Sequence, residues 1–144
     1  MFYKLLKFNI IGDNRGSLIS LEQKKNIPFK IKRVYYIYNT EPNVIRGKHS
    51  HPDLKQVIVC VNGSCNFLLD NGKKKEIIKL NSPNIGLYLG KNIWREMYDF
   101  SKDCVLMVLA SDIYKENEYI RDYQKFLETT KKRILKKKKL ILIR

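Results

Sequence analysis

The stretch that decides the fold class spans residues 56–72 and reads Q-V-I-V-C-V-N-G-S-C-N-F-L-L-D-N-G. Residues 56–61 are almost continuously apolar, which is typical of a strand buried on both faces. Asn62-Gly63 then predicts a turn, and residues 64–69 run into Asp70-Asn71-Gly72, the strongest hairpin signal in the sequence. This stretch therefore predicts β structure.

Similar short runs lie on both sides of this stretch, at 2–11, 17–21, 29–38, 75–80, 86–89 and 105–110. Many short strands at near-regular spacing favour a sandwich or barrel over alternating β–α units, so the expected fold class is all-β. Residues 116–127 alone predict a helix, because five apolar residues recur there at three- and four-residue spacing. The basic residues that follow are expected to form a frayed helix or disordered end, or else an amphipathic, weakly membrane-associated helix.

The chain length of 144 residues fits one domain, which we place at 1–128, followed by a basic tail at 129–144. The net charge is +15, but residues 131–144 alone carry eight cations and no acid. The remaining body is only moderately basic, so nucleic-acid binding is not expected, although such a body would attract a diphosphate-bearing ligand.

The three cysteines are odd in number and form no C-x-x-C pair, which favours reduced, structural thiols. The opening run breaks at Asn9 before any long apolar region, so no signal peptide is expected. No apolar stretch reaches membrane-spanning length, so stable membrane insertion is not expected either. We therefore expect a cytoplasmic protein.

The only two histidines, His49 and His51, are two residues apart in Arg46-Gly47-Lys48-His49-Ser50-His51. On an extended strand such side chains point to the same face, so both imidazoles would address one cavity. Imidazole is well matched to proton transfer at neutral pH. A metal site and an ordinary hydrogen-bonded pair are the alternatives.

Counting possible ligands weighs against a metal. No third histidine exists, and the buried strand begins with Gln56, whose neutral amide is a weak ligand compared with a carboxylate. Asp53 remains a possible ligand, but strand alternation does not clearly direct it inward. We expect no metal and no cofactor.

Arginines and aromatic residues form a second set of candidates. Arg33 and Tyr35 share one face of the strand predicted at 29–38, where they suit a phosphate, or else lie at the rim and in the core. Arg15 stands in a turn where a barrel mouth is expected, although a solvated turn charge fits equally. Trp94, the single tryptophan, suits stacking on a base or sugar as well as core packing.

Several separated motifs resemble, in the same order, those of the dTDP-4-dehydro-6-deoxyglucose 3,4-ketoisomerases, over about residues 5–127. The motifs are Gly12-Asp13-x-Arg15-Gly16, Ile27-Pro28-Phe29-x-Ile31-Lys32-Arg33-Val34-Tyr35-Tyr36-Ile37, Arg46-Gly47-x-His49-x-His51, Gly86-Leu87-Tyr88, Trp94-x-Glu96-Met97 and Tyr119-Ile120-Arg121-Asp122-Tyr123. The related dTDP-sugar 3,5-epimerases share R-G-x-H but lack the second histidine, so His51 favours the ketoisomerases.

The resemblance implies a cupin, or jelly-roll, β-barrel with a short C-terminal helix, and a homodimer that exchanges N-terminal strands. It also implies an incomplete metal set, because Gln56 stands at the usual glutamate position and Leu89 near the last histidine position. The implied substrate is a dTDP-linked 4-keto-6-deoxy sugar, isomerised to the 3-keto sugar through an enediol. Such products enter deoxyamino-sugar biosynthesis for surface glycans such as lipopolysaccharide O-antigen.

The resemblance also implies roles for individual residues: proton transfer by His49 and His51, with His49 as the base; enediolate stabilisation by Arg46 and Arg95; diphosphate binding by Arg15, Arg33 and Tyr35; and further substrate contacts from Gln56 and Trp94. Residue 95 differs among relatives, so Arg15 together with Arg95 leaves the product configuration at C4 open. A non-catalytic nucleotide-sugar-binding cupin, a dTDP-sugar epimerase and a metal-dependent cupin oxygenase are the alternative functions.

Overall fold

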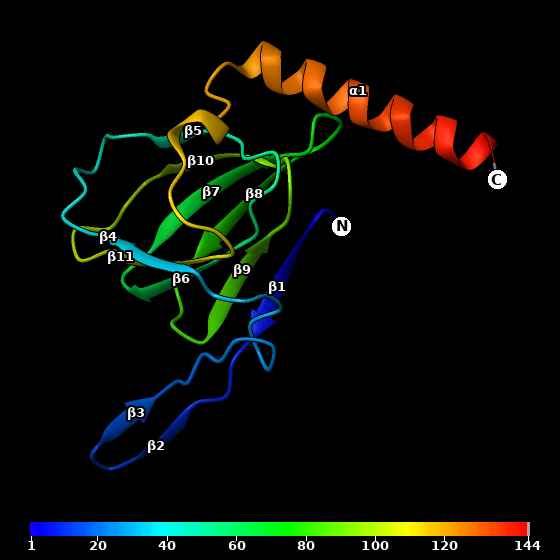
Figure 1. The fold of residues 1–144 in the computed structure, drawn as a ribbon. Coiled ribbons are helices and arrows are strands. Elements are labelled where there is room, and N and C mark those ends of the chain that lie inside the picture. Colours follow the sequence, from blue (N-terminus) through cyan, green and yellow to red (C-terminus); the bar gives the residue numbers. More distant parts are fainter. Residues whose placement is uncertain (144) are drawn as a thin grey trace.

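Residues 1–143, which the computed structural model describes, form eleven strands, a 3-10 helix and one long α-helix (Figure 1). The strands are β1 (Tyr3–Lys7), β2 (Ile11–Asp13), β3 (Gly16–Leu18), β4 (Arg33–Ile37), β5 (Arg46–His49), β6 (Gln56–Asn62), β7 (Cys65–Asp70), β8 (Lys75–Leu80), β9 (Ile85–Leu89), β10 (Trp94–Tyr98) and β11 (Val105–Ala110). The helices are η1 (Glu116–Glu118) and α1 (Tyr123–Leu142).

Two antiparallel sheets form the body of the protein. One has the strand order β1-β9-β6-β11-β4, and the other has the order β5-β10-β7-β8. The main core joins them, with Ile58 and Leu106 from the first sheet and Phe67 and Met97 from the second in the same buried cluster. The predicted all-β cupin-type fold is confirmed.

Strand β6 is buried on both faces, as its continuous apolar sequence predicts. Ile58 belongs to the core between the sheets, whereas Val57 and Val59 pack on the other face with Phe8 and Phe29. The segments after β1 and before β4 therefore cover the outer face of the large sheet.

The predicted turn at 70–72 joins β7 to β8. The Asp70 carboxylate accepts the backbone N–H of Gly72 at 2.6 Å, and Gly72 has a φ of +84°. A Cβ at Gly72 would lie 2.8 Å from the Thr130 side chain, so this turn and α1 pack too closely for a larger residue. A hydrogen bond also joins this turn to α1, because the Tyr123 hydroxyl donates to Asp70 at 2.6 Å.

The helix prediction at 116–127 is wrong in its boundaries. Only a 3-10 turn forms at η1, and Ile120 instead pairs as an isolated bridge with Ser50. The α-helix begins after Asp122, whose carboxylate accepts the backbone N–H of Lys125 at 2.7 Å and so caps the first turn. From there α1 continues to Leu142, in place of a short helix with a frayed or disordered end. The predicted boundary at 128 falls inside it.

Strand β10 is absent from the predicted strands. It lies between β5 and β7, and Arg95 on it is buried although it is charged. The alternation of Trp94, Arg95 and Glu96 therefore lacks the apolar period that reveals a strand. Within residues 1–143, no helix combines the length and apolar character that crossing a membrane requires.

Candidate functional site

A cavity of about 500 Å³ opens between strands β4, β5 and β10 and the segment that follows β11. This volume is in the range of small-molecule sites. Its lining is mostly basic and aromatic: Arg33, Tyr35, Ile37, Arg46, Gly47, His49, Met97, Tyr114, Tyr119 and Arg121. Four of the residues singled out in the sequence, Arg33, Tyr35, Arg46 and His49, are therefore brought together.

The two imidazoles lie side by side at the end of β5. Their ring centroids are 4.7 Å apart at an interplanar angle of 79°. His49 is paired in register with Arg95 of β10. A bulge immediately precedes His49 in the chain, at Gly47 and Lys48, both of which have positive φ. The bridge between Ser50 and Ile120 fixes the next residues, so His51 is buried directly beside His49.

Besides Tyr114 and Arg121, the sequence analysis missed Tyr119 as a residue of the site. Its ring centroid lies 4.9 Å from that of His49 and 4.3 Å from that of His51, so it contacts both imidazoles. Tyr119 belongs to one of the motifs that carry the family resemblance, but its spacing from Tyr123 placed it on a helix stripe instead. The motif contains Tyr119, but the helical spacing predicts a packing role for it.

Arg95 is buried next to the imidazoles, with 2% of its surface exposed. None of its three guanidinium nitrogens has a hydrogen-bond partner among the described residues, and neither has Nε2 of His51. An isolated buried charge is costly, so it is retained where an anion is to be held. Burial lowers the pKa of Arg95 to about 10, which still leaves it charged at neutral pH.

Both histidines are neutral at physiological pH. Burial lowers the pKa of His49 to about 4 and that of His51 to about 2, and the charge of Arg95 is the next cause in both cases. A neutral imidazole has a lone pair available, so each ring can accept a proton.

Tyr35 lines the cavity, and its hydroxyl is bonded to a buried side chain behind the cavity wall. Its hydroxyl accepts the side-chain N–H of Gln56 at 3.0 Å, and burial raises its pKa. The Arg33 guanidinium lies over the rings of Tyr35 and Tyr114, 5.0 and 5.5 Å from their centroids. Gln56 thus contacts the site through Tyr35, and Arg33 is held in place for an anion by two aromatic faces.

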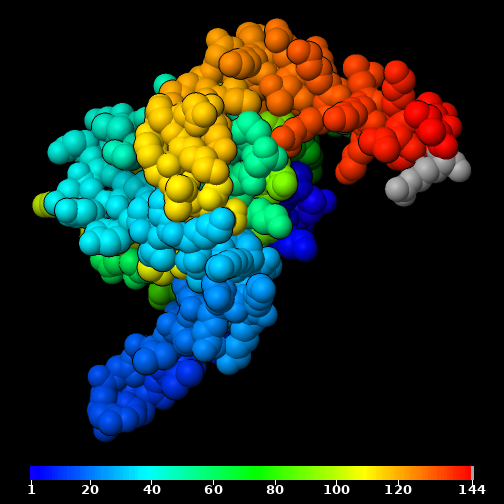
Figure 2. All heavy atoms as spheres, in the orientation of Figure 1, coloured from blue at the N-terminus to red at the C-terminus, as the bar shows by residue number. Residues whose placement is uncertain are grey.

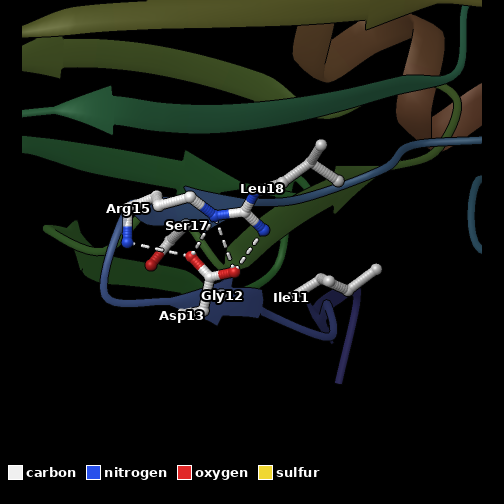
Figure 3. A pocket seen from close by; sticks show the side chains of 7 residues that line it. Ile11, Gly12, Asp13, Arg15, Ser17 and Leu18 are labelled. Carbon is white, nitrogen blue, oxygen red and sulfur yellow. Dashed lines mark hydrogen bonds and ion pairs between the residues drawn. The ribbon is translucent and has the colours of Figure 1, made fainter.

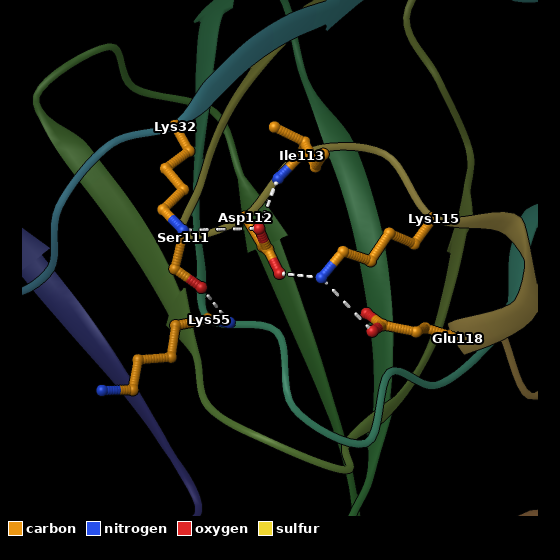
Figure 4. Close-up of polar contacts among 7 residues, drawn as sticks. All are labelled: Lys32, Lys55, Ser111, Asp112, Ile113, Lys115 and Glu118. Carbon is orange, nitrogen blue, oxygen red and sulfur yellow. Dashed lines mark hydrogen bonds and ion pairs between the residues drawn. The ribbon is translucent and has the colours of Figure 1, made fainter.

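The segment between β11 and α1 carries Tyr114, Tyr119 and Arg121 across the cavity, and Asp112 anchors its start (Figure 4). The Asp112 carboxylate accepts the backbone N–H of Ile113 at 2.9 Å and the ammonium of Lys115 at 2.7 Å. Lys32, which precedes β4, lies 3.6 Å from the same carboxylate. Further along, the Arg121 guanidinium lies 4.5 Å from the ring centroid of Tyr119.

Trp94 does not reach the cavity, which corrects its assignment as a substrate-binding residue. It is 4% exposed and packs against Tyr123 and Phe126 of α1, with ring centroids 5.2 and 5.7 Å away. Because successive residues of a strand point to opposite faces, Trp94 lies on the helix side of β10 whereas Arg95 faces the histidines. The core-packing alternative is the one observed.

Arg15 also lies outside the cavity within this chain. It stands at the turn of the β2–β3 hairpin, which projects from the body of the protein (Figure 1). There it pairs with Asp13 over a shallow, open hollow (Figure 3). The expected position at a barrel mouth is wrong for a single chain, because the hairpin leaves the body instead of folding over it.

Residues 1–143 contain no group of three or more His, Cys, Asp or Glu side chains that could hold a metal. The groups packed around the two imidazoles are a tyrosine and a buried guanidinium, whose positive charge opposes a cation. Absence of a metal remains a prediction that elemental analysis tests.

The family model described as FdtA: WxcM-like, C-terminal matches residues 1–131. A TDP-4-oxo-6-deoxy-alpha-D-glucose-3,4-oxoisomerase from Aneurinibacillus thermoaerophilus is 55% identical over 123 residues, covering 85% of this chain and 88% of the relative. The crystal structure of a 3,4-ketoisomerase from Helicobacter canadensis is 56% identical, with a TM-score of 0.89 over 91% of this chain and 98% of that one.

A third similar protein was solved with a sugar nucleotide bound. It is an asparagine-for-histidine variant of the 3,4-ketoisomerase QdtA from Thermoanaerobacterium thermosaccharolyticum, in complex with TDP-4-keto-6-deoxyglucose. It is 47% identical, with a TM-score of 0.90 over 93% of this chain and 97% of that one. On the evidence of the family model and these relatives, the chain is an isomerase and belongs to the family of cupin-type dTDP-sugar 3,4-ketoisomerases.

Proposed function

We propose that the protein converts dTDP-4-keto-6-deoxyglucose into the dTDP-3-keto-6-deoxyhexose by proton transfer through an enediol. The ketone at C4 makes the C3 proton acidic, because the resulting carbanion delocalises onto the carbonyl oxygen. The net reaction moves one proton from C3 to C4 and one from the C3 oxygen to the C4 oxygen. No electron acceptor is needed, since one carbon is oxidised as its neighbour is reduced.

The observation that carries this proposal is the buried, unpartnered guanidinium of Arg95 beside two neutral imidazoles. The enediolate is the anion that forms during the reaction, and Arg95 is a preorganised cation for it in a site screened from water. The same charge keeps the imidazoles unprotonated before substrate binds. An anion that neutralises Arg95 raises the pKa of His49 and His51, so they become stronger bases when the substrate is present.

We assign His49 as the base that removes the C3 proton, because it lines the cavity directly, and His51 as its partner in proton delivery. Tyr119 packs against both rings and holds their orientation. Positioned proton transfer of this kind contributes roughly 10²–10⁴-fold to the rate.

The diphosphate is assigned to the arginines at the cavity mouth. Arg33 stacks on two tyrosines, Arg121 on one, and Arg46 lines the exposed side. Arg121 already pairs with the Glu116 carboxylate, so Arg33 and Arg46 carry this assignment. A planar guanidinium binds phosphate oxygens in pairs, which suits a nucleoside diphosphate.

The test is NMR of the dTDP-4-keto sugar incubated with the protein in D₂O after chelator treatment. We expect the 3-keto product with deuterium at C4, and the face of deuteration reports its configuration. His49→Asn and His51→Asn are each expected to lose roughly 10²–10⁴-fold in rate while still binding dTDP in calorimetry. Binding without any exchange in the wild-type protein would instead identify a non-catalytic binding cupin, and deuterium at C5 an epimerase.

We also propose a homodimer in which N-terminal strands are exchanged. Every residue of β2 and β3 is exposed, including the apolar Ile11 and Leu18, although the hairpin is well formed. A projecting hairpin with apolar side chains fits a second copy of the chain. In such a dimer Arg15 would reach the cavity of the partner subunit, which restores its predicted role in diphosphate binding.

We also propose a cellular location and a use for the product. Cys60, Cys65 and Cys104 are buried and unpaired, which fits a reducing compartment, and we place the protein in the cytoplasm. The 3-keto product is the kind of precursor that an amino-group transfer converts into a deoxyamino sugar for surface glycans such as lipopolysaccharide O-antigen.

A further inference from the structure

The segment of residues 131–143, which comprises the distal part of α1 and its C-cap Ile143, has a composition unlike the rest of the chain. Its cations are Lys131, Lys132, Arg133, Lys136, Lys137, Lys138 and Lys139, and it contains no acid. The family model ends at residue 131, so this segment extends beyond the part of the chain that the isomerase family shares.

The proximal turns of α1 account for its attachment to the protein. Phe126 and Thr130 are buried, and Thr130 accepts the side-chain N–H of Asn92 at 2.8 Å. Among residues 1–143, the last polar contact between α1 and the body is that of Arg133, which donates to the carbonyl of Pro52 at 2.8 Å. Beyond it the helix projects away from the body (Figures 1 and 2).

The projecting turns also expose apolar side chains. Leu135, Leu140, Ile141, Leu142 and Ile143 are between 53% and 86% exposed. Four of these residues form a continuous block that directly follows the four lysines at 136–139. A block of large apolar residues beside a block of lysines, held away from the body on a helix, is a surface that no other part of residues 1–143 covers.

We propose that residues 131–143 dock the protein on an anionic lipid surface. The lysines meet the phosphate headgroups, and Leu140, Ile141, Leu142 and Ile143 enter the boundary between headgroups and acyl chains. Long lysine stems allow their ammonium groups to stay at the headgroups while the apolar end of the helix goes deeper. The proximal turns keep the isomerase body attached at a fixed place on the helix.

The apolar block selects a lipid surface over other anionic partners. RNA or DNA would pair with the lysines but would leave Leu140, Ile141 and Leu142 in water. A second copy of the same helix would cover the apolar residues but would bring two sets of seven cations together. An anionic lipid surface both pairs with the lysines and removes the apolar side chains from water.

The test is flotation of the full-length protein with vesicles, using phosphatidylcholine alone and phosphatidylcholine mixed with phosphatidylglycerol. We expect binding only to the mixed vesicles, weakening as salt rises. Replacing Lys136, Lys137, Lys138 and Lys139 by Gln should weaken binding about a hundredfold or more, since a basic residue near an anionic surface strengthens binding roughly fivefold.

A matched control replaces four exposed lysines of the body, Lys30, Lys73, Lys79 and Lys102, by Gln. It removes the same charge, and none of these lysines forms an ion pair with a described residue. Binding should change far less than in the helix variant. Isomerase activity on the soluble sugar nucleotide should be unchanged in both variants, which shows that each is folded.

The apolar contribution is tested by Leu140→Ser, Ile141→Ser and Leu142→Ser together, which should abolish the binding that persists at high salt. The proposal is overturned if the wild-type protein does not float with the mixed vesicles, or if both lysine variants lose binding equally. It is also overturned if the serine variant binds as wild type, or if single-stranded RNA competes fully with the vesicles, because the partner is then a polyanion of another class.

Discussion

Arg95 is 2% exposed, and its guanidinium nitrogens have no hydrogen-bond partner among residues 1–143. His49 stands opposite it in the strand register, and His51 and Tyr119 pack alongside His49. A buried cation without an anion lowers the free energy of unfolding of the free protein. An anion that forms or binds beside Arg95 removes this destabilisation. Function and stability are therefore expected to oppose each other at this residue.

Arg95→Met is expected to stabilise the protein by about 1–4 kcal/mol, because an apolar side chain of similar length replaces an unpaired buried charge. The same change should lower kcat about 10²–10³-fold, since the enediolate loses its cation. Urea unfolding and steady-state kinetics measure the two effects. Arg46→Met, at the exposed side of the cavity, serves as control and should leave stability within about 0.5 kcal/mol. A destabilised Arg95→Met protein would contradict this account.

The histidines make stability depend on pH. Their folded pKa values, about 4 for His49 and about 2 for His51, lie below the ordinary value near ~6.5 of the unfolded chain. The unfolded state therefore binds more protons below pH ~6.5, so stability is fully present above that pH and falls as pH drops toward 4. The slope should approach about 1.4 kcal/mol per pH unit for each imidazole.

Urea unfolding between pH 7 and pH ~5 measures this slope, in a window above the titration of ordinary carboxylates. The double variant His49→Asn with His51→Asn should lose most of it. A slope that is equally steep in the double variant would show that other groups cause the acid sensitivity.

At the scale of elements, the site is assembled where β5 and β10 meet the segment between β11 and α1. Sequence patterns identified β6 through β9 and β11, because their apolar residues recur with the period of a strand. They missed β10, where a charged residue faces inward, and they extended the helix over Tyr119, which lies on extended chain. Arg95 breaks the apolar pattern of its strand, whereas Tyr119 fits a helical spacing that the chain does not adopt, and both are residues to which we assign a role in the reaction.

Asp112 is expected to act as a positioning residue for that segment. Asp112→Ala removes the contacts to Ile113 and Lys115 that anchor its start (Figure 4). We therefore expect Tyr119 and Arg121 to be held less firmly over the cavity. We expect about a tenfold loss of kcat/KM, mainly through KM, measured by steady-state kinetics. Asp53→Ala, which removes ion pairs to Lys91 and Arg133 elsewhere, should leave kcat/KM unchanged. Equal effects of the two substitutions would contradict a positioning role.

At the scale of the whole molecule, two parts project from the body: the β2–β3 hairpin and the distal turns of α1 (Figure 1). The hairpin exposes apolar residues and one arginine, and the helix exposes lysines and apolar residues. The first fits a second copy of the chain and the second a lipid surface. Part of the net charge of +15 is thus concentrated at the C-terminal end, and none of these cations lines the cavity.

The exchanged dimer makes a prediction about mixed subunits. Arg15→Ala and His49→Asn should each be poorly active alone. Unfolding and refolding the two together should restore about a quarter of wild-type activity, because half of the dimers are mixed and each mixed dimer has one intact cavity. Activity assays before and after mixing measure this. No recovery, with mixed dimers present by native mass spectrometry, would show that Arg15 does not act across the subunits.

Sequence alone was enough for the fold class, because strand periodicity is local. It was enough for the reaction class through the separated motifs that resemble those of the 3,4-ketoisomerases, among them His49 and His51. Only the tertiary structure decided which other residues join them. Trp94 packs against α1 instead of lining the cavity, and Arg15 lies on a hairpin that projects from the body. Tyr119 and Arg95, which are distant from the histidines in sequence, lie next to them in the structure. The physical reason is that a side chain's face is set by the pairing register of its strand and by what packs on it, and these depend on residues that are distant in sequence.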